Sequence, residues 1–300
     1  MPKIFRCVAG VLLAGVTCAA VAQSAQDIAA FKAKGESGDA TAQYNLGVFY
    51  ANEQDYAQAV VWYRKAADQG DPEAQTNLGS LYARGAGVPE DHIQAAAWWR
   101  KAAEQGNALA QVKLGLSYAE GQGVPQDYGK AATWYRKAAD QGHVAAMDLL
   151  GRLYENGQGV PQDYGEAARW YRKAAGVGIA DAQWIADAQE RLGRLYDLGE
   201  GVRQDYTQAS ALYRKAAEQG NADAQWGLGI LYFGGQGVPQ DYSEAYFWLD
   251  LAAAGKLDAA RAEAVPRARD LAASKLAPAD LSAAQDRARK WFEDHPAKAQ

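Results

Sequence analysis

The chain lacks the residues from which most cross-links and metal sites are built. Its two cysteines, Cys7 and Cys18, both lie within the first 22 residues, so the remaining chain cannot form a disulfide and depends on packing for its stability. The three histidines, His92, His143 and His295, are far apart, and no pair has the spacing of metal ligands. We therefore expect no metal and no cofactor.

No apolar run in the sequence is long enough to cross a membrane as a helix. The candidate, from Cys7 to Val21, has about 15 residues against the roughly 20 that a span requires. It follows Lys3 and Arg6 and is closed by the small residues Ala20 and Ala22, which is the layout of a signal peptide. We expect residues 1–22 to be removed by cleavage after Ala22. The chain is then exported, to the periplasm or, alternatively, out of the cell.

An excess of basic charge is also missing. Lys3 and Arg6 fall in the predicted signal peptide, which leaves 29 basic against 36 acidic residues and a net charge of −7, with the two signs interleaved along the chain. Nucleic acids and anionic membranes attract basic surfaces. We therefore expect neither as a partner, and no insertion into a membrane.

What the sequence does contain is a repeat. The pair Leu-Gly followed by Tyr four residues after the Leu occurs six times, with spacings of 32, 36, 36, 42 and 36 residues. A period of this length is typical of solenoids and other repeat architectures. The repeated leucines are Leu46, Leu78, Leu114, Leu150, Leu192 and Leu228.

Each repeat is predicted to fold as two helices. Apolar residues recur at intervals of three and four, as in Tyr128, Ala131, Ala132 and Tyr135, and the alternation that marks a strand is absent. An Asp precedes each second segment, where an N-cap is needed, and a Gly such as Gly142 usually closes it, where a left-handed C-cap is needed. The Gly after each repeated Leu would weaken a helix by about 1 kcal/mol, so it predicts a close approach of the paired helix.

The combined pattern of Leu-Gly, Tyr, G-x-G-V, Asp, Ala, Trp-Tyr, Lys-Ala-Ala and Gly resembles the Sel1-like repeat, a relative of the tetratricopeptide repeat. The match runs from about Gly38 to Gly255. The resemblance implies an all-α fold, a right-handed α-solenoid of about six helix-turn-helix repeats. We place the repeats at residues 38–70, 71–106, 107–142, 143–178, 179–220 and 221–255.

Two repeats depart from the pattern, and the segments outside the repeats are expected to cap the stack. The first repeat lacks the G-x-G-V-P loop, and the fifth has six extra residues within 179–190, which either lengthen the start of its first helix or loop out. Residues 23–37 are predicted as the N-terminal cap. Residues 256–300 are predicted as C-terminal capping helices, with one helix interrupted at Pro266 and a last helix opened by Pro278.

No combination of residues has the spacing of a catalytic site. The G-x-G loops lack the preceding strand and the third glycine of a nucleotide-binding fingerprint, so they are interpreted as turns. The repeated Asp stands before every second helix, which favours capping over acid–base chemistry. We therefore expect a non-catalytic protein.

A binding surface has to be sought where the repeats differ. If the repeated Leu is numbered position 7 of its helix, positions 2, 5, 9 and 12 lie opposite the core-facing edge; residues at these positions form what we call the variable face. In tetratricopeptide relatives this side lines the concave groove, and the resemblance implies the same here. The candidate partner-binding residues are Tyr44, Val48, Leu109, Val112, Leu116, Arg152, Arg194, Trp226, Ile230 and Phe233.

The apolar candidates have a second interpretation, in which they touch the neighbouring first helix or are covered by the terminal caps. As a binding surface, an apolar stretch beside a charged one suits an amphipathic helix or an extended peptide. The leading hypothesis is an exported scaffold or adaptor, expected as a monomer, that binds a partner protein or peptide in envelope assembly or regulation. A secreted effector that contacts a host is the alternative. A β-lactamase-like enzyme is disfavoured, because the family branch so described is rich in cysteine and the mature chain has none.

Overall fold

The computed structural model describes residues 25–177 and 182–295, and every regular element among them is an α-helix. This confirms the predicted all-α class. The predicted signal peptide, residues 1–22, lies outside the described residues. The chain divides into two compact units between Gln126 and Asp127. The right-handed twist expected of the stack stays a prediction.

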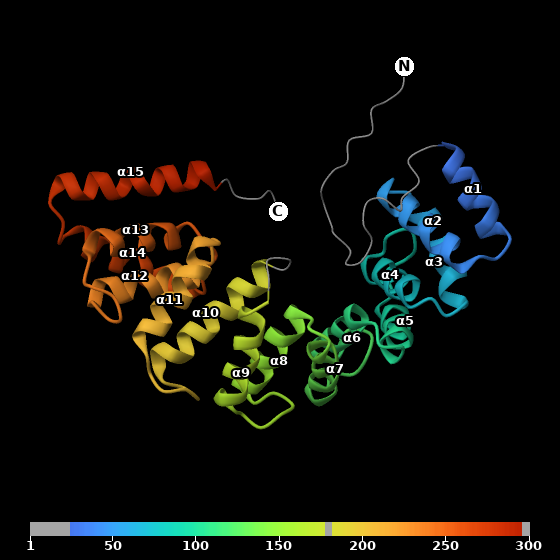
Figure 1. Ribbon diagram of the computed structural model, residues 1–300, viewed down its shortest axis with the longest axis horizontal. Coiled ribbons are helices and arrows are strands. Elements are labelled where there is room, and N and C mark those ends of the chain that lie inside the picture. Colours follow the sequence, from blue (N-terminus) through green and yellow to red (C-terminus); the bar gives the residue numbers. More distant parts are fainter. Residues whose placement is uncertain (1–24, 178–181, 296–300) are drawn as a thin grey trace, which may run out of the picture. The chain divides into compact units, whose positions relative to one another are not determined.

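Unit 1 holds six described helices, coloured from blue to green in Figure 1. Within it α2 pairs with α3 and α4 with α5, and α3 packs on α4 and α5 on α6, so that successive repeats stack directly on one another. The helix before the first repeat, α1, packs on α2. The helices are α1 (Ala25–Glu36), α2 (Ala40–Asn52), α3 (Tyr56–Asp68), α4 (Pro72–Arg84), α5 (His92–Glu104) and α6 (Ala108–Glu120).

Unit 2 continues the same pairing and ends in two further helices. The repeats pair α8 with α9, α10 with α11 and α12 with α13, while α14 and α15 both pack on α13. The helices are α7 (Tyr128–Asp140), α8 (Val144–Asn156), α9 (Tyr164–Ala175), α10 (Ala182–Leu198), α11 (Tyr206–Glu218), α12 (Ala222–Gly234), α13 (Tyr242–Ala253), α14 (Ala259–Ala273) and α15 (Pro278–Asp294).

The residues expected to begin and end the second helices do so. The carboxylate of Asp127 accepts a hydrogen bond from the backbone N–H of Lys130 at 2.9 Å, and an Asp caps each of the other five second helices in the same way. Such a cap contributes about 1 kcal/mol. Gly142, which follows α7, has a φ of +90°, a conformation that glycine adopts without strain. Both predictions are confirmed.

The glycine after the repeated leucine marks the place where the two helices of a repeat touch. A Cβ added at Gly47 would lie 2.3 Å from the Tyr63 ring, and one added at Gly151 would lie 2.6 Å from the Tyr171 ring. Both tyrosines are buried, at 2% and 0% exposed. Burying a large apolar side chain contributes about 2–3 kcal/mol, which more than offsets the cost of the glycine. The predicted close approach is confirmed.

Two short sequences that recur in the repeats, G-x-G and RKAA, make contacts between neighbouring repeats. Gly159 has a φ of +69°, and a Cβ added to it would lie 2.2 Å from the carbonyl carbon of Tyr128 in the preceding repeat. The Arg of RKAA donates to the Tyr hydroxyl of the next first helix, as Arg100 does to Tyr118 at 3.0 Å. The loop was predicted only as a turn, because a contact between repeats leaves no trace in the local pattern.

The two irregular segments of the sequence both form longer helices. Helix α10 has 17 residues where α8 has 13, so the described part of the insert lengthens the start of that helix; residues 178–181 lie outside the described residues. Helix α14 runs through Pro266, so the predicted interruption is wrong. Proline removes one backbone hydrogen bond, but the neighbouring Val265 is fully buried and packing on α13 holds the helix. Pro278 opens α15, as predicted.

None of the described helices is long and apolar enough to cross a membrane.

Candidate partner-binding site

Position 5 of the variable face is buried in the four middle repeats. The exposed fractions are 1% for Thr76, 5% for Val112, 0% for Asp148 and 7% for Glu190. A position this deeply buried contacts the protein itself rather than a partner. Val112 therefore has little surface to offer, although the sequence analysis placed it among the candidates.

Position 9 remains accessible in part, whatever residue stands there. Leu116 on α6 and Arg194 on α10 are half-buried, and Arg152 on α8 is exposed. Leu109, at position 2 of α6, is also half-buried. Because equivalent helices carry leucine or arginine at position 9, packing between repeats does not dictate its identity. Leu109 and Leu116 therefore stay the clearest apolar candidates.

The candidates at the two ends of the repeat array share their surface with the protein's own core. Tyr44 and Val48 pack against a cluster of buried residues on α3, α4 and α5. Trp226, Ile230 and Phe233 pack against the cluster formed by α11, α12, α13 and the C-terminal helices. All five are half-buried. Intramolecular packing, the second interpretation of these residues, thus accounts for part of each side chain.

The charged part of the variable face is paired within unit 2. Asp148 on α8 is completely buried, and its carboxylate oxygen lies 3.4 Å from Nε of Arg191 on α10. Neither carboxylate oxygen accepts a hydrogen bond from the described residues. Burial raises the pKa of Asp148 to about 6, although Arg191 and Arg152 oppose the shift. Charge attraction alone therefore holds this carboxylate against the cost of its desolvation.

A second ion pair joins the same two helices. Arg194 pairs with Glu155, whose other carboxylate oxygen accepts a hydrogen bond from the Tyr171 hydroxyl at 2.7 Å. Burial raises the pKa of the neighbouring Glu190 to about 7, with Arg191 and Arg194 opposing the shift. The candidate Arg194 is thus engaged inside the protein. Among the charged candidates, Arg152 is the one that is exposed.

Lys113 on α6 is a residue that the sequence analysis did not single out. It is half-buried, and its Nζ lies 5.6 Å from the centre of the Trp99 ring. Burial lowers its pKa, and the charge of Arg84 on α4 adds to the shift. None of the described acidic side chains forms an ion pair with it. The available signal was its register, because Lys113 lies four residues after Leu109 and three before Leu116.

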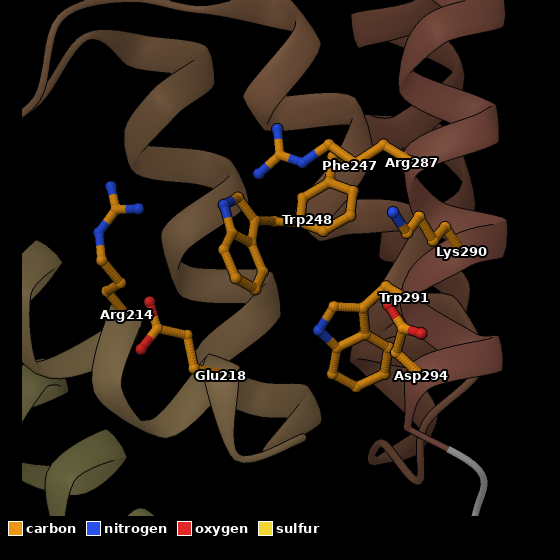
Figure 2. A pocket seen from close by; sticks show the side chains of 8 residues that line it. All are labelled: Arg214, Glu218, Phe247, Trp248, Arg287, Lys290, Trp291 and Asp294. Carbon is orange, nitrogen blue, oxygen red and sulfur yellow. The ribbon is translucent and has the colours of Figure 1, made fainter.

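A separate pocket of about 330 Å³ lies in unit 2, between α11, α13 and α15 (Figure 2). Arg287 of α15 forms an ion pair with Glu244 and lies 3.8 Å from the centre of the Phe247 ring, so the contacts beside the pocket hold α15 in place. None of the candidate partner-binding residues lines it. The lining side chains are Arg214, Glu218, Phe247, Trp248, Arg287, Lys290, Trp291 and Asp294.

The described residues contain no group of His, Cys, Asp and Glu side chains that could hold a metal ion.

The Sel1 repeat family model matches the chain six times. The matched residues are 40–71, 72–107, 108–143, 144–177, 186–221 and 222–256, which together make up more than half of the sequence. No curated protein matches the chain.

Solved structures of similar proteins come from several bacteria. A Sel1 repeat protein from Oxalobacter formigenes is 33% identical with a TM-score of 0.70, over 86% of this chain and 98% of that one. A protective antigen present in uropathogenic Escherichia coli strains, described as displaying an SLR fold, is 27% identical with a TM-score of 0.49, over 92% and 90%. A putative Sel1 repeat protein from Klebsiella pneumoniae is 24% identical with a TM-score of 0.44, over 68% and 98%. The six matches of the family model and the similarity to the Oxalobacter formigenes protein show that the chain belongs to the Sel1 repeat family.

Proposed function

We propose that this protein is a non-catalytic scaffold that binds a partner protein or peptide through its variable face, with the main contact on α6. The observation that carries the proposal is the pair of half-buried leucines, Leu109 and Leu116. At the equivalent positions α8 has Ala145 and Arg152, so the packing of first helices does not require leucine there. Apolar surface without a packing reason is typical of an interaction site.

We further propose that the chain is exported and meets its partner in the envelope. The support is the charged start, Lys3 and Arg6, followed by the apolar run and the small residues up to Ala22. Expression of the full sequence in a bacterium, followed by mass spectrometry of the periplasmic fraction, tests this. We expect a mature N-terminus at Gln23, whereas a protein that keeps Met1 and stays in the cytoplasm would contradict export.

The partner contact is best tested by cross-linking from single positions. A photo-reactive amino acid is placed at position 116, and in a control variant at position 93, where Ile93 on α5 is 69% exposed but outside the variable face. We expect a cross-linked partner from position 116 and none from position 93. The Leu109→Glu substitution should abolish the cross-link from position 116 without changing the helical circular-dichroism spectrum.

Two results would count against this assignment. One is the absence of any cross-link from position 116, and the other is the same set of cross-links from both positions. Position 226 is less suitable for the test, because Trp226 also packs against the core of unit 2 and its replacement would disturb folding.

A further inference from the structure

The repeat register places two cations at equivalent positions in very different surroundings. Arg191 stands at position 6 of repeat five, and its counter-ion Asp148 stands at position 5 of the preceding repeat, 3.4 Å away. Lys113 stands at position 6 of repeat three. The residue that corresponds to Asp148 is there Thr76, whose hydroxyl donates to the Pro72 carbonyl of its own helix at 2.7 Å. Repeat three thus has the cation of this pair without the anion.

The surroundings of Lys113 disfavour its charge. It is half-buried beside Trp99, and the described residues near it include a second cation, Arg84, but no acidic partner. Burial and Arg84 both lower the pKa of Lys113. A carboxylate supplied from outside would offset both effects, because its charge attracts the Lys113 ammonium and its oxygens accept hydrogen bonds in place of water.

Apolar side chains lie on both sides of this cation. Leu109, Lys113 and Leu116 are spaced by four and three residues, so they follow one another along a single stripe of α6, which we call the α6 stripe. Both leucines are half-buried and keep accessible surface. A ligand lying along the stripe therefore meets an apolar side chain, a cation and a second apolar side chain in that order.

We propose that the α6 stripe binds a peptide segment of a partner protein in which an Asp or Glu side chain lies between two apolar residues. The proposal rests on the function proposed above and specifies its ligand. An internal acidic residue is favoured over a chain terminus, because the leucines on both sides of Lys113 call for apolar side chains before and after the carboxylate. The Lys113 ammonium donates to the carboxylate, and the leucines supply apolar contact.

Selection from a library of random peptides, displayed without a free C-terminus, tests the proposal with the full chain. We expect the recovered peptides to carry an Asp or Glu flanked by apolar residues. For such a peptide, replacing the acid by its amide should weaken binding about tenfold, and Lys113→Gln should do the same. The matched control is Lys101→Gln, because Lys101 also lies over a tryptophan, 4.0 Å from the Trp98 ring, but on the second helix α5.

The Thr76→Asp variant gives a second, independent readout. It installs in repeat two the carboxylate that Asp148 provides in repeat four, so Lys113 gains an internal counter-ion and the acidic peptide should bind about tenfold more weakly. The proposal would be overturned if the selected peptides lacked acidic residues. It would also be overturned if an acidic peptide bound equally well to the wild type, Lys113→Gln and Thr76→Asp. If position 116 still cross-links a partner in that case, the scaffold function stands and only the acidic ligand fails.

Discussion

The variable face is built differently in repeats two and three than in repeats four and five. In the later repeats, Asp148 and Glu155 on α8 form ion pairs with Arg191 and Arg194 on α10. These four charges are therefore paired within unit 2. In the earlier repeats Lys113 has no such counter-ion, and half-buried leucines stand on both sides of it. Equivalent positions of the first helices thus carry paired charges in repeats four and five, and a lysine between two half-buried leucines in repeat three.

The difference comes down to the residue at position 5. It is buried in both regions, and in repeat four its carboxylate lies 3.4 Å from position 6 of the next first helix, where Asp148 faces Arg191. Thr76 at the same position has no charge to offer. One buried side chain therefore decides whether the next cation is neutralised inside the protein or is available to a ligand.

The largest effect is expected when the closed pair is broken. Arg191→Ala leaves Asp148 buried without its counter-ion, which should lower the free energy of unfolding by about 3 kcal/mol at neutral pH. The matched substitution Lys113→Ala removes a cation that forms no ion pair with the described acidic residues, and should change stability by less than about 1 kcal/mol. Urea unfolding of both variants measures this. Equal losses would mean that the two regions do not differ.

A smaller effect should appear in the pH dependence. The pKa of Asp148 is raised from 3.8 to about 6 in the folded protein, so the folded state binds the proton more tightly than the unfolded chain. Stability is therefore lost as the pH rises from about 4 to about 6, and about 1.4 kcal/mol of the loss falls between pH 5 and pH 8. Asp148→Asn should remove this part of the pH dependence.

The control for this measurement is Asp140→Asn, because Asp140 is exposed on α7 and its replacement keeps the pair of Asp148 and Arg191 intact. A pH profile of Asp148→Asn that parallels the wild type would contradict the assignment of the loss to Asp148.

Another variant, Thr76→Asp, gives repeat two the buried carboxylate that Asp148 provides in repeat four. In a double-mutant cycle, Thr76→Asp and Lys113→Ala should show a coupling free energy of about 1 kcal/mol, because the new carboxylate gains stability only when Lys113 is present to pair with it. Thermal unfolding of the wild type, the two single variants and the double variant gives this value. Additive effects would show that residues 76 and 113 do not approach each other as Asp148 and Arg191 do.

The smallest effect is expected from exchanging the position 9 residues. Leu116→Arg gives repeat three the position 9 residue of repeat four, and Arg152→Leu makes the reverse change. Because position 9 is partly accessible, each substitution should change the free energy of unfolding by less than about 0.5 kcal/mol. A loss above about 1 kcal/mol for Leu116→Arg would assign Leu116 to the core of unit 1 and remove it from the proposed site.

The helices and their ends follow from the sequence because their causes are local. Asp127 caps the helix that begins one residue later, and Gly142 follows the end of the same helix. The glycine after each repeated leucine predicted a close contact without naming its partner, which is Tyr63 for Gly47. Pro266 shows the limit of such reasoning, because its local effect is outweighed by the packing of α14 on α13.

The candidate site was predicted less completely. Helical periodicity placed Leu109 and Leu116 on the variable face, and both keep accessible surface. It placed Val112 there as well, although that side chain is 5% exposed. Lys113 was missed because it stands at position 6, outside the four positions of the variable face, although its spacing from Leu109 and Leu116 was visible in the sequence.

The sequence by itself thus determined the number of repeats, the two-helix unit and the residues that begin and end each helix, because these depend on spacing within one repeat. Only the tertiary structure decided which variable-face residues are buried, which charges pair and where a cation stays without its counter-ion. Those properties depend on contacts between neighbouring first helices more than 30 residues apart in sequence, such as that between Asp148 and Arg191. Burial and Coulomb attraction act across that distance in space, and no local pattern records them.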